Sequence, residues 1–226
     1  MKILIIIIIC FSTFVSNSFP IPKNNVANFD VIRKNKIIGS VETTFEKVNN
    51  NLIVTTTVDI KVKVLFLSAY EFFQKSEETW LKNNFISFKG HTDFEDDREY
   101  FIDGQDTDDQ FVVFGMDGEL KLKKDIIPLN YWNKSILKQK NIFDTQKGIL
   151  RKITVKKLND EIIKINKKEI LTEKYLLNAS KHIKDLGPFP EYTIWYSKKN
   201  GELIKFKFTN WKDKKDVITQ RNDLDK

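Results

Sequence analysis

The chain has 226 residues, of which 38 are basic and 31 acidic, giving a formal charge of +7. Hydrophobic residues make up 41% and charged residues 31% of the chain, a balance that excludes a disordered tail and a polytopic membrane protein. Four of the basic residues are arginine and the rest lysine, whereas phosphate recognition favours the planar guanidinium group of arginine. The positive charge therefore indicates a solvated surface and argues against a nucleic-acid partner.

The N-terminus has the pattern of a secretory signal peptide. Lys2 supplies a positive charge, residues 3–15 form an apolar stretch, and the small residues Ser16 and Ser18 precede a cleavage point before residue 19. An uncleaved membrane anchor is the alternative, but this stretch is shorter than the roughly 20 residues that cross a bilayer core. We therefore expect residues 1–18 to be removed on export, which leaves a periplasmic or otherwise secreted protein.

The single cysteine, Cys10, lies within this expected signal peptide. Its removal leaves a chain without a disulfide, a thiolate metal site or a cysteine nucleophile. Residues 19–28 are expected to form a short extended lead-in, because two prolines are followed by several asparagines. Residues 29–226 are long enough to build their own hydrophobic core, and we expect them to form one domain.

Apolar and polar residues alternate along most of the remaining sequence. In the clearest run, residues 54–64, the even positions are Val, Ile or Thr, and the odd positions are Thr, Asp or Lys. This alternation predicts strands of an antiparallel sheet with one solvated face. Shorter runs of the same kind cover residues 37–45, 149–155 and 204–208, and the last of these places Ile204, Phe206 and Phe208 on one face.

Turn sequences separate these runs at residues 34–36, 49–51, 117–118 and 200–201. Asp-Gly and Asn-Gly supply the positive φ angles of tight hairpins. The alternation is interrupted over residues 128–144, and we expect one short helix or ordered loop near residues 130–142. The sequence therefore predicts an all-β domain built on a single large curved antiparallel sheet, a half-open barrel.

Two polar features are candidates for chemistry. Residues 93–109 carry nine carboxylates, and closely spaced oxygen ligands suit calcium. Their spacing, however, matches no EF-hand loop. Acidic residues at hairpin tips also protect the edges of a sheet. His91 lies two residues before Asp93, yet the chain has neither a Gly-x-Ser-x-Gly elbow nor an HExxH motif. We therefore predict no catalytic residue, no metal site and no cofactor.

Aromatic side chains are the second prominent feature of the composition, at 12% of the chain. Aromatic rings commonly fill the inner face of a sheet. The functional alternative is an apolar groove or cavity on the concave face, which must be covered by loops or by a ligand. Asn133 and Asp144 would order the loop at its entrance. The candidate ligand-binding residues are Tyr70, Trp80, Tyr131, Trp132, Asn133, Asp144, Trp195 and Tyr196.

A series of short motifs resembles one known family. The motifs are Phe29–Arg33 with Ile38-Gly39, Val58–Val62, Ala69-Tyr70, Glu77–Trp80, Thr92-Asp93, Pro128–Asn133, Asp144-Thr145 with Gly148, and Trp195-Tyr196 with Gly201 and Lys205. In this order and spacing they resemble a family of secreted bacterial proteins described as domain of unknown function 6134. The resemblance implies an exported, sheet-rich single domain with no assigned reaction. That family often has a histidine where this chain has Tyr131, which argues against an acid–base role for the site.

Three functions remain open at this point. The first is a non-enzymatic domain that binds an apolar small molecule or lipid on its concave face by burying apolar surface. The second is a structural or interaction module that binds an envelope protein through a strand edge or through its uneven charge, since residues 1–113 are net acidic and residues 114–226 net basic. The third is a hydrolytic enzyme that uses His91, Asp93 or Asp144.

Overall fold

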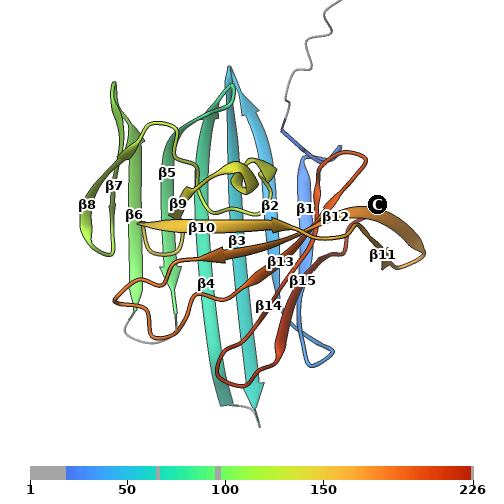
Figure 1. Cartoon of the computed structure of the whole chain (residues 1–226). Helices are drawn as coiled ribbons and strands as arrows, with labels where there is room; N and C mark the ends of the chain where they lie inside the picture. Colours follow the sequence, from blue (N-terminus) through green and yellow to red (C-terminus); the bar gives the residue numbers. More distant parts are fainter. Residues whose placement is uncertain (1–18, 65–66, 95–97, 225–226) are drawn as a thin grey trace, which may run out of the picture.

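The computed structural model describes residues 19–64, 67–94 and 98–224 (Figure 1). The expected signal peptide, with Cys10 and the expected cleavage point, lies outside these residues, and so does part of the acidic segment 93–109. None of the helical residues in the described ranges forms a segment long and apolar enough to cross a membrane.

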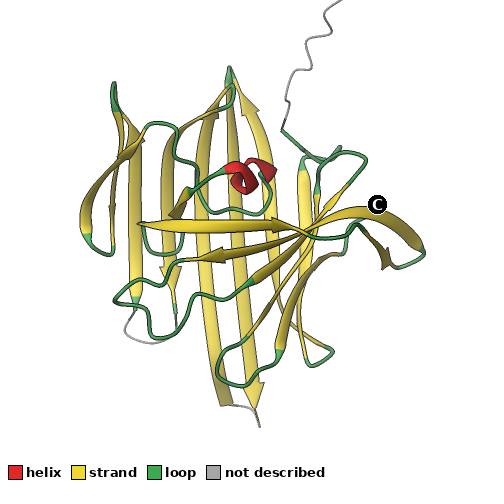
Figure 2. Cartoon of the chain, viewed as in Figure 1, coloured by secondary structure: helices red, strands yellow, loops and turns green. Residues whose placement is uncertain are grey.

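The described chain is built of strands and one short 3-10 helix, η1 (Figure 2). The elements are β1 (Val26–Arg33), β2 (Lys36–Val48), β3 (Asn51–Val64), β4 (Leu67–Leu81), β5 (Asn84–Asp93), β6 (Glu99–Asp106), β7 (Gln110–Gly115), β8 (Gly118–Lys123), η1 (Lys134–Lys138), β9 (Asn141–Asp144), β10 (Ile149–Lys157), β11 (Glu161–Ile165), β12 (Lys168–Ala179), β13 (Tyr192–Ser197), β14 (Leu203–Thr209) and β15 (Asp216–Arg221).

These strands form one antiparallel sheet of 15 strands that does not close on itself. Its order is β8-β7-β6-β5-β4-β3-β2-β1-β15-β14-β13-β12-β10-β9, with β11 paired to β12. The sheet curls so that β10, with β12 beside it, crosses over the long strands β2–β5, and β13–β15 lead back to β1 (Figure 1). The predictions of an all-β half-open barrel and of one short helix near residues 130–142 are therefore confirmed.

Hairpin turns lie where the turn sequences predicted them. Lys34 and Asn35 join β1 to β2 with φ angles of 48° and 60°, and Gly118 and Gly201 have φ angles of 83° and 75°. Non-glycine residues rarely adopt such angles, although asparagine is enriched among those that do. These turns connect neighbouring strands with few intervening residues, so long strands follow one another directly in sequence and in space.

The prediction that Ile204 shares a face of its strand with Phe206 and Phe208 is wrong. Trp195 of β13 pairs with Lys205, but the next residue, Tyr196, pairs with Leu203, so a bulge leaves Ile204 without a partner in the ladder. A bulge reverses the faces on either side of it. Phe206 and Leu203 therefore contact the main core, whereas Ile204 packs in a small separate cluster with Trp195.

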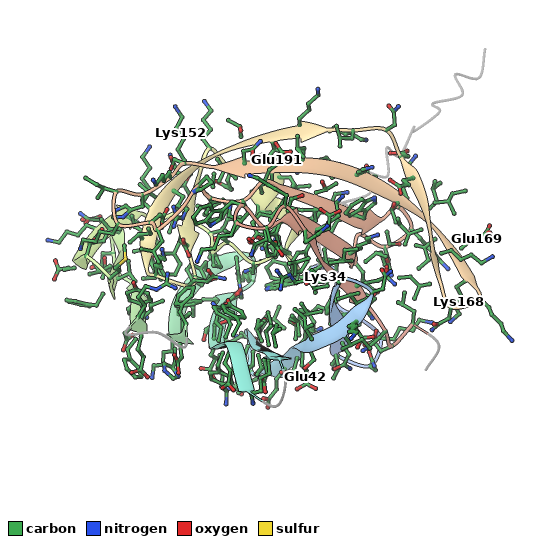
Figure 3. The ribbon with its side chains drawn as sticks, turned by 90° about the horizontal axis from the view of Figure 1, so that it is seen from below. Lys34, Glu42, Lys152, Lys168, Glu169 and Glu191 are labelled. Carbon is green, nitrogen blue, oxygen red and sulfur yellow. The ribbon has the colours of Figure 1, made fainter. Side chains whose placement is uncertain are left out.

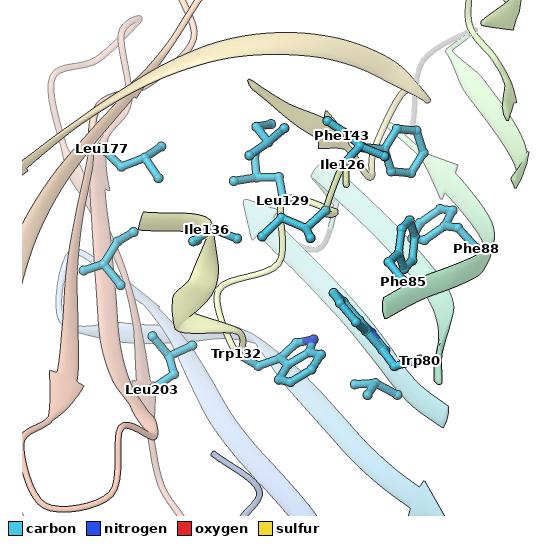
Figure 4. Close-up of a cluster of buried hydrophobic side chains, with 14 of the residues drawn as sticks. Trp80, Phe85, Phe88, Ile126, Leu129, Trp132, Ile136, Phe143, Leu177 and Leu203 are labelled. Atoms are coloured by element: carbon cyan, nitrogen blue, oxygen red, sulfur yellow. The ribbon is translucent and has the colours of Figure 1, made fainter. Parts of the chain in front are cut away.

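The main core lies between the two layers of the curled sheet. Figure 4 shows Leu129, Trp132 and Ile136 placed between Trp80 of one layer and Leu203 of the other. Charged side chains such as Glu42, Lys152 and Glu191 point away from this interior (Figure 3). The division follows the alternation of each strand, because successive side chains point to opposite faces of a sheet.

Candidate functional site

The space between the two layers contains a cavity of about 360 Å³. Its floor is formed by the inward side chains of β1–β4. On β4 these are Tyr70, Phe72, Gln74, Ser76 and Glu78, which alternate with outward residues and all line the cavity. Eight residues of extended strand span about 26 Å, so the cavity is long and follows β4 along its length.

The cavity wall continues from β4 across the paired strands β3, β2, β1, β15 and β14. One row runs from Phe72 of β4 to Phe206 of β14, and all but one of its members line the cavity. The row consists of Phe72, Ile60, Gly39, Val31, Thr219 and Phe206, each paired with the next across a ladder. The register therefore brings residues that are distant in the sequence onto one mostly apolar surface.

The opposite wall is supplied by the segment of residues 124–148, which we call the cover, and by the loop of residues 180–191. The cover is held by its own backbone, since Leu129 donates to the carbonyl of Phe143 at 2.7 Å and Phe143 donates to that of Ile127 at 3.0 Å. Asn133 accepts from the backbone of Ser135 at 3.0 Å and so begins η1. The cover is thus an ordered element of the fold.

The two ends of the cavity differ in exposure. Tyr70, Leu186 and Trp211 line one end and are 41%, 66% and 42% exposed, whereas Glu78 at the other end of β4 is 1% exposed. The rings of Trp80 and Trp132 pack edge to face beside Glu78, with centroids 5.8 Å apart. The cavity is therefore open at the Tyr70 end and closed at the Glu78 end.

Glu78 is the acidic group of the closed end. Its Oε2 accepts from Trp80 Nε1 at 3.0 Å, from Trp132 Nε1 at 3.3 Å and from Asn130 Nδ2 at 2.7 Å, and its Oε1 accepts from Asn130 Nδ2 at 2.8 Å. Burial raises the pKa of Glu78 from 4.5 to about 7, although these hydrogen bonds favour the charged form. A perturbed carboxyl group in a cavity is characteristic of a functional site.

Four further charged groups of the wall form a buried network. Arg151 bonds Asp144 through Nε at 2.5 Å and Asp185 through Nη1 at 2.8 Å, and Lys147 bonds Asp185 at 2.5 Å. Burial acts to raise the pKa of Asp185, but the bonds from Arg151 and Lys147 outweigh it and hold this pKa well below its usual value. The four formal charges cancel, so the network ties the cover to the loop 180–191 without giving the wall a net charge.

The structure divides the candidate residues into three groups. Tyr70, Tyr131, Trp132 and Asp144 line the cavity. Burial raises the pKa of Tyr131 well above its usual value, so its hydroxyl is neutral at physiological pH.

Two candidates lie behind the wall. Trp80 is 1% exposed and bonds Glu78 from behind, and Asn133 is 2% exposed and caps η1. Asn133 therefore stabilises the start of η1 from a buried position, and it does not lie at the rim of the cavity.

Trp195 and Tyr196 require a correction, because neither lines the cavity. Trp195 lies on the opposite face of β13, where its indole donates to Glu161 at 3.1 Å between the ammonium groups of Lys174 and Lys205. Tyr196 is fully buried in the core. Motif order alone does not reveal which face of a strand a residue occupies.

The polar features considered from the sequence lie elsewhere. His91 bonds Glu99 at 2.7 Å and stacks on Phe101, which is itself 70% exposed. Lys124 pairs with Asp106 at 3.3 Å in the acidic β6–β7 hairpin. Over the described ranges, no group of three or more His, Cys, Asp or Glu side chains is arranged to hold a metal ion.

Sequence reasoning did not single out Glu78, Arg151 or Asp185 as site residues. The alternation along β4 could have revealed Glu78. It lies an even number of residues from Phe72 and Trp80, so its side chain points to the same buried face as theirs. Arg151 similarly lies between Ile149 and Ile153, both of which are buried. A charged residue at an inward position is rarely buried without a partner.

Fold and site together define a half-open β-barrel domain with an internal cavity entered from one end. The sequence matches the model of the family described as Domain of unknown function (DUF6134) over residues 29–215, and the chain belongs to this family. This confirms the resemblance carried by the sequence motifs.

A solved structure is also similar to this chain. It is the β-barrel-like protein of domain of unknown function DUF1849 from Brucella abortus, with a TM-score of 0.58 and 14% sequence identity over 87% of this chain and 94% of that one. At this identity the likeness shows the fold alone. No curated protein sequence matches the chain.

Proposed function

We propose that this domain binds an apolar or lipid-like small molecule in the cavity between its two layers. The observation that carries the proposal is a cavity of about 360 Å³ that is open at one end, closed at the other, and walled mainly by apolar side chains of β1–β4 and β14. Small-molecule sites have this form: concave, mostly apolar and with a few placed polar groups. Each buried methylene of a ligand would contribute about 0.8 kcal/mol.

The shape of the cavity favours a long ligand. The wall follows β4 from Tyr70 to Glu78, about 26 Å at the rise of a strand. The exposed side chains of Leu186 and Trp211 lie at the open end, where an entering molecule would first meet apolar surface. An extended alkyl or polyprenyl chain fits such a space better than a compact polar metabolite.

Binding is tested by displacement of the fluorescent probe N-phenyl-1-naphthylamine from the purified protein. Val58→Trp, on the cavity wall, should abolish probe binding because the indole fills the space. Thr57→Trp, the neighbouring residue on the outer face of β3, is the matched control and should leave binding intact. Equal binding by both variants would refute the cavity as the site.

We further propose that the domain acts outside the cytoplasm, after cleavage near Ser18. The support is the sequence pattern of residues 1–18, with one basic residue, an apolar stretch and small residues before Phe19. Intact mass measurement of the protein recovered from its own cells should give a chain that begins near Phe19. Recovery of the full-length chain from the cytoplasm would contradict this proposal.

A further inference from the structure

The closed end of the cavity has an unusual acceptor. Glu78 forms no ion pair with any residue that the structure describes, and its three hydrogen-bonding neighbours, Trp80, Asn130 and Trp132, are neutral donors. Buried carboxylates are ordinarily paired with a cation. The protein thus keeps an unpaired acidic group at the end of an apolar space.

The hydrogen bonds to Glu78 are unequally shared between its two oxygens. Oε2 accepts three of them, whereas Oε1 accepts one, from Asn130. Each oxygen of a carboxylate has two lone pairs. Glu78 itself lines the cavity, and Oε1 is its oxygen with an accepting position left over.

Several other polar groups of the wall are engaged with one another. Gln74 donates to the backbone carbonyl of Thr145 at 3.1 Å, and the hydroxyl groups of Thr43 and Thr56 lie 3.2 Å apart. The charges of the Arg151 network are mutually paired. Unlike the Arg151 network, Glu78 is a buried charged group of the wall whose hydrogen-bonding partners in the described chain are all neutral, so its charge remains for the polar end of a ligand.

We propose that Glu78 receives the end group of a long-chain amphiphile, and that this end group is a hydrogen-bond donor, either an alkylammonium or a hydroxyl group. The proposal rests on the proposed function of the cavity. A ligand with a terminal carboxylate is rejected, because two carboxylates in a desolvated site disfavour each other's charge. Selectivity arises because Glu78 offers an acceptor, while the donors of Trp80, Asn130 and Trp132 are directed to Glu78 itself.

The first test compares three ligands of equal chain length, dodecylamine, dodecan-1-ol and dodecanoate, as displacers of N-phenyl-1-naphthylamine at pH 8.5. We expect the amine or the alcohol to bind about 10- to 100-fold more tightly than dodecanoate, as for a hydrogen bond to a charged group. The tighter of the two identifies the donor. If dodecanoate binds as tightly as dodecylamine and dodecan-1-ol, the role of Glu78 is wrong but the cavity still binds amphiphiles. If none of the three ligands binds, the proposed function is wrong as well.

Glu78→Gln provides the sharper test. The amide oxygen of this variant, in the place of Oε2, can accept from Trp80, Trp132 and Asn130. Its NH2 group, in the place of Oε1, gives up the second hydrogen bond from Asn130 and presents a donor to the ligand. The preference should then shift toward dodecanoate by at least tenfold. Glu77→Gln makes the same change on the exposed face of β4 and should keep the wild-type order. If Glu78→Gln keeps the wild-type order of affinities for the three ligands, the proposed role of Glu78 is wrong.

Wild-type protein gives an independent test that requires no variant. Burial raises the pKa of Glu78 to about 7, so lowering the pH from 8.5 to 5.5 protonates it, and the advantage of dodecylamine over dodecan-1-ol should fall about tenfold. The side chains that face Glu78 do not titrate. The other titratable groups along the wall are Tyr70, Arg98, Tyr131, Asp144, Lys147, Arg151, Asp185 and Tyr192. An amine-to-alcohol ratio that is constant over this pH range would contradict the assignment.

Discussion

Glu78 should make the stability of this protein fall as the pH rises through the weakly acidic range. Burial raises the pKa of its carboxyl group from 4.5 to about 7. Between these values the folded protein retains a proton that the unfolded chain releases, so the free energy of unfolding decreases with increasing pH. At 1.36 kcal/mol per pKa unit, the loss between pH 4.5 and pH 8 reaches about 3 kcal/mol.

The perturbation is Glu78→Gln, and the assay is urea denaturation at a series of pH values, followed by tryptophan fluorescence. The variant cannot titrate at this position, so its stability should lack the decline of about 3 kcal/mol seen in the wild type. Asp185 does not interfere, because its lowered pKa confines its contribution to more acidic solutions. Glu77→Gln, on the exposed face of the same strand, should retain the wild-type profile.

Parallel pH profiles of the wild type and Glu78→Gln would refute this reasoning. They would mean that Glu78 is hydrated in the folded protein, or that a cation pairs with it, and in either case the carboxyl group would keep an ordinary pKa. A parallel profile would also remove the basis for a pH-dependent ligand preference. The comparison concerns the slope of the free energy of unfolding against pH. A loss of stability in the variant that is the same at every pH therefore does not affect the conclusion.

Three further predictions follow from the packing. Arg151→Met should destabilise the fold by about 3–5 kcal/mol in urea denaturation, because it leaves the buried carboxylate of Asp144 without its cation and Asp185 with Lys147 as its remaining cation; a loss below 1 kcal/mol would contradict the network. Gly115→Ala should cost about 1–3 kcal/mol, since its Cβ would lie 2.6 Å from the backbone of Gly148, and wild-type stability would show that the contact can relax. Trp195→Phe should leave probe affinity unchanged, because Trp195 lies outside the cavity, and a tenfold loss would place it in the site after all.

Local patterns were sufficient to predict the strands. The alternation over residues 54–64 lies within β3, and the turn sequences at 34–36, 117–118 and 200–201 lie between paired strands. These signals are local, since period-two alternation and positive φ angles depend on neighbouring residues. The error at Ile204 arose because a bulge is a property of two strands and cannot be recognised from the sequence of one.

The candidate site was predicted less completely than the fold. Tyr70, Tyr131, Trp132 and Asp144 line the cavity, but Trp195 occupies the other face of its strand. Aromatic residues are equally suited to a cavity wall and to a solid core, so their abundance does not distinguish the two. The distinction depends on whether opposing side chains meet, and this is decided by the distance between the layers.

The sequence by itself determined that this is an all-β chain of consecutive hairpins with a solvated, lysine-rich exterior, because alternation, turn residues and composition act locally. Tertiary structure alone decided that the sheet curls around a cavity and that Glu78 lies at its closed end beside Trp80, Asn130 and Trp132. Asn130 and Trp132 reach Glu78 from a segment about 50 residues away in the chain. The pKa of Glu78 and the polarity of the site depend on that approach, since desolvation is set by everything that packs around a group.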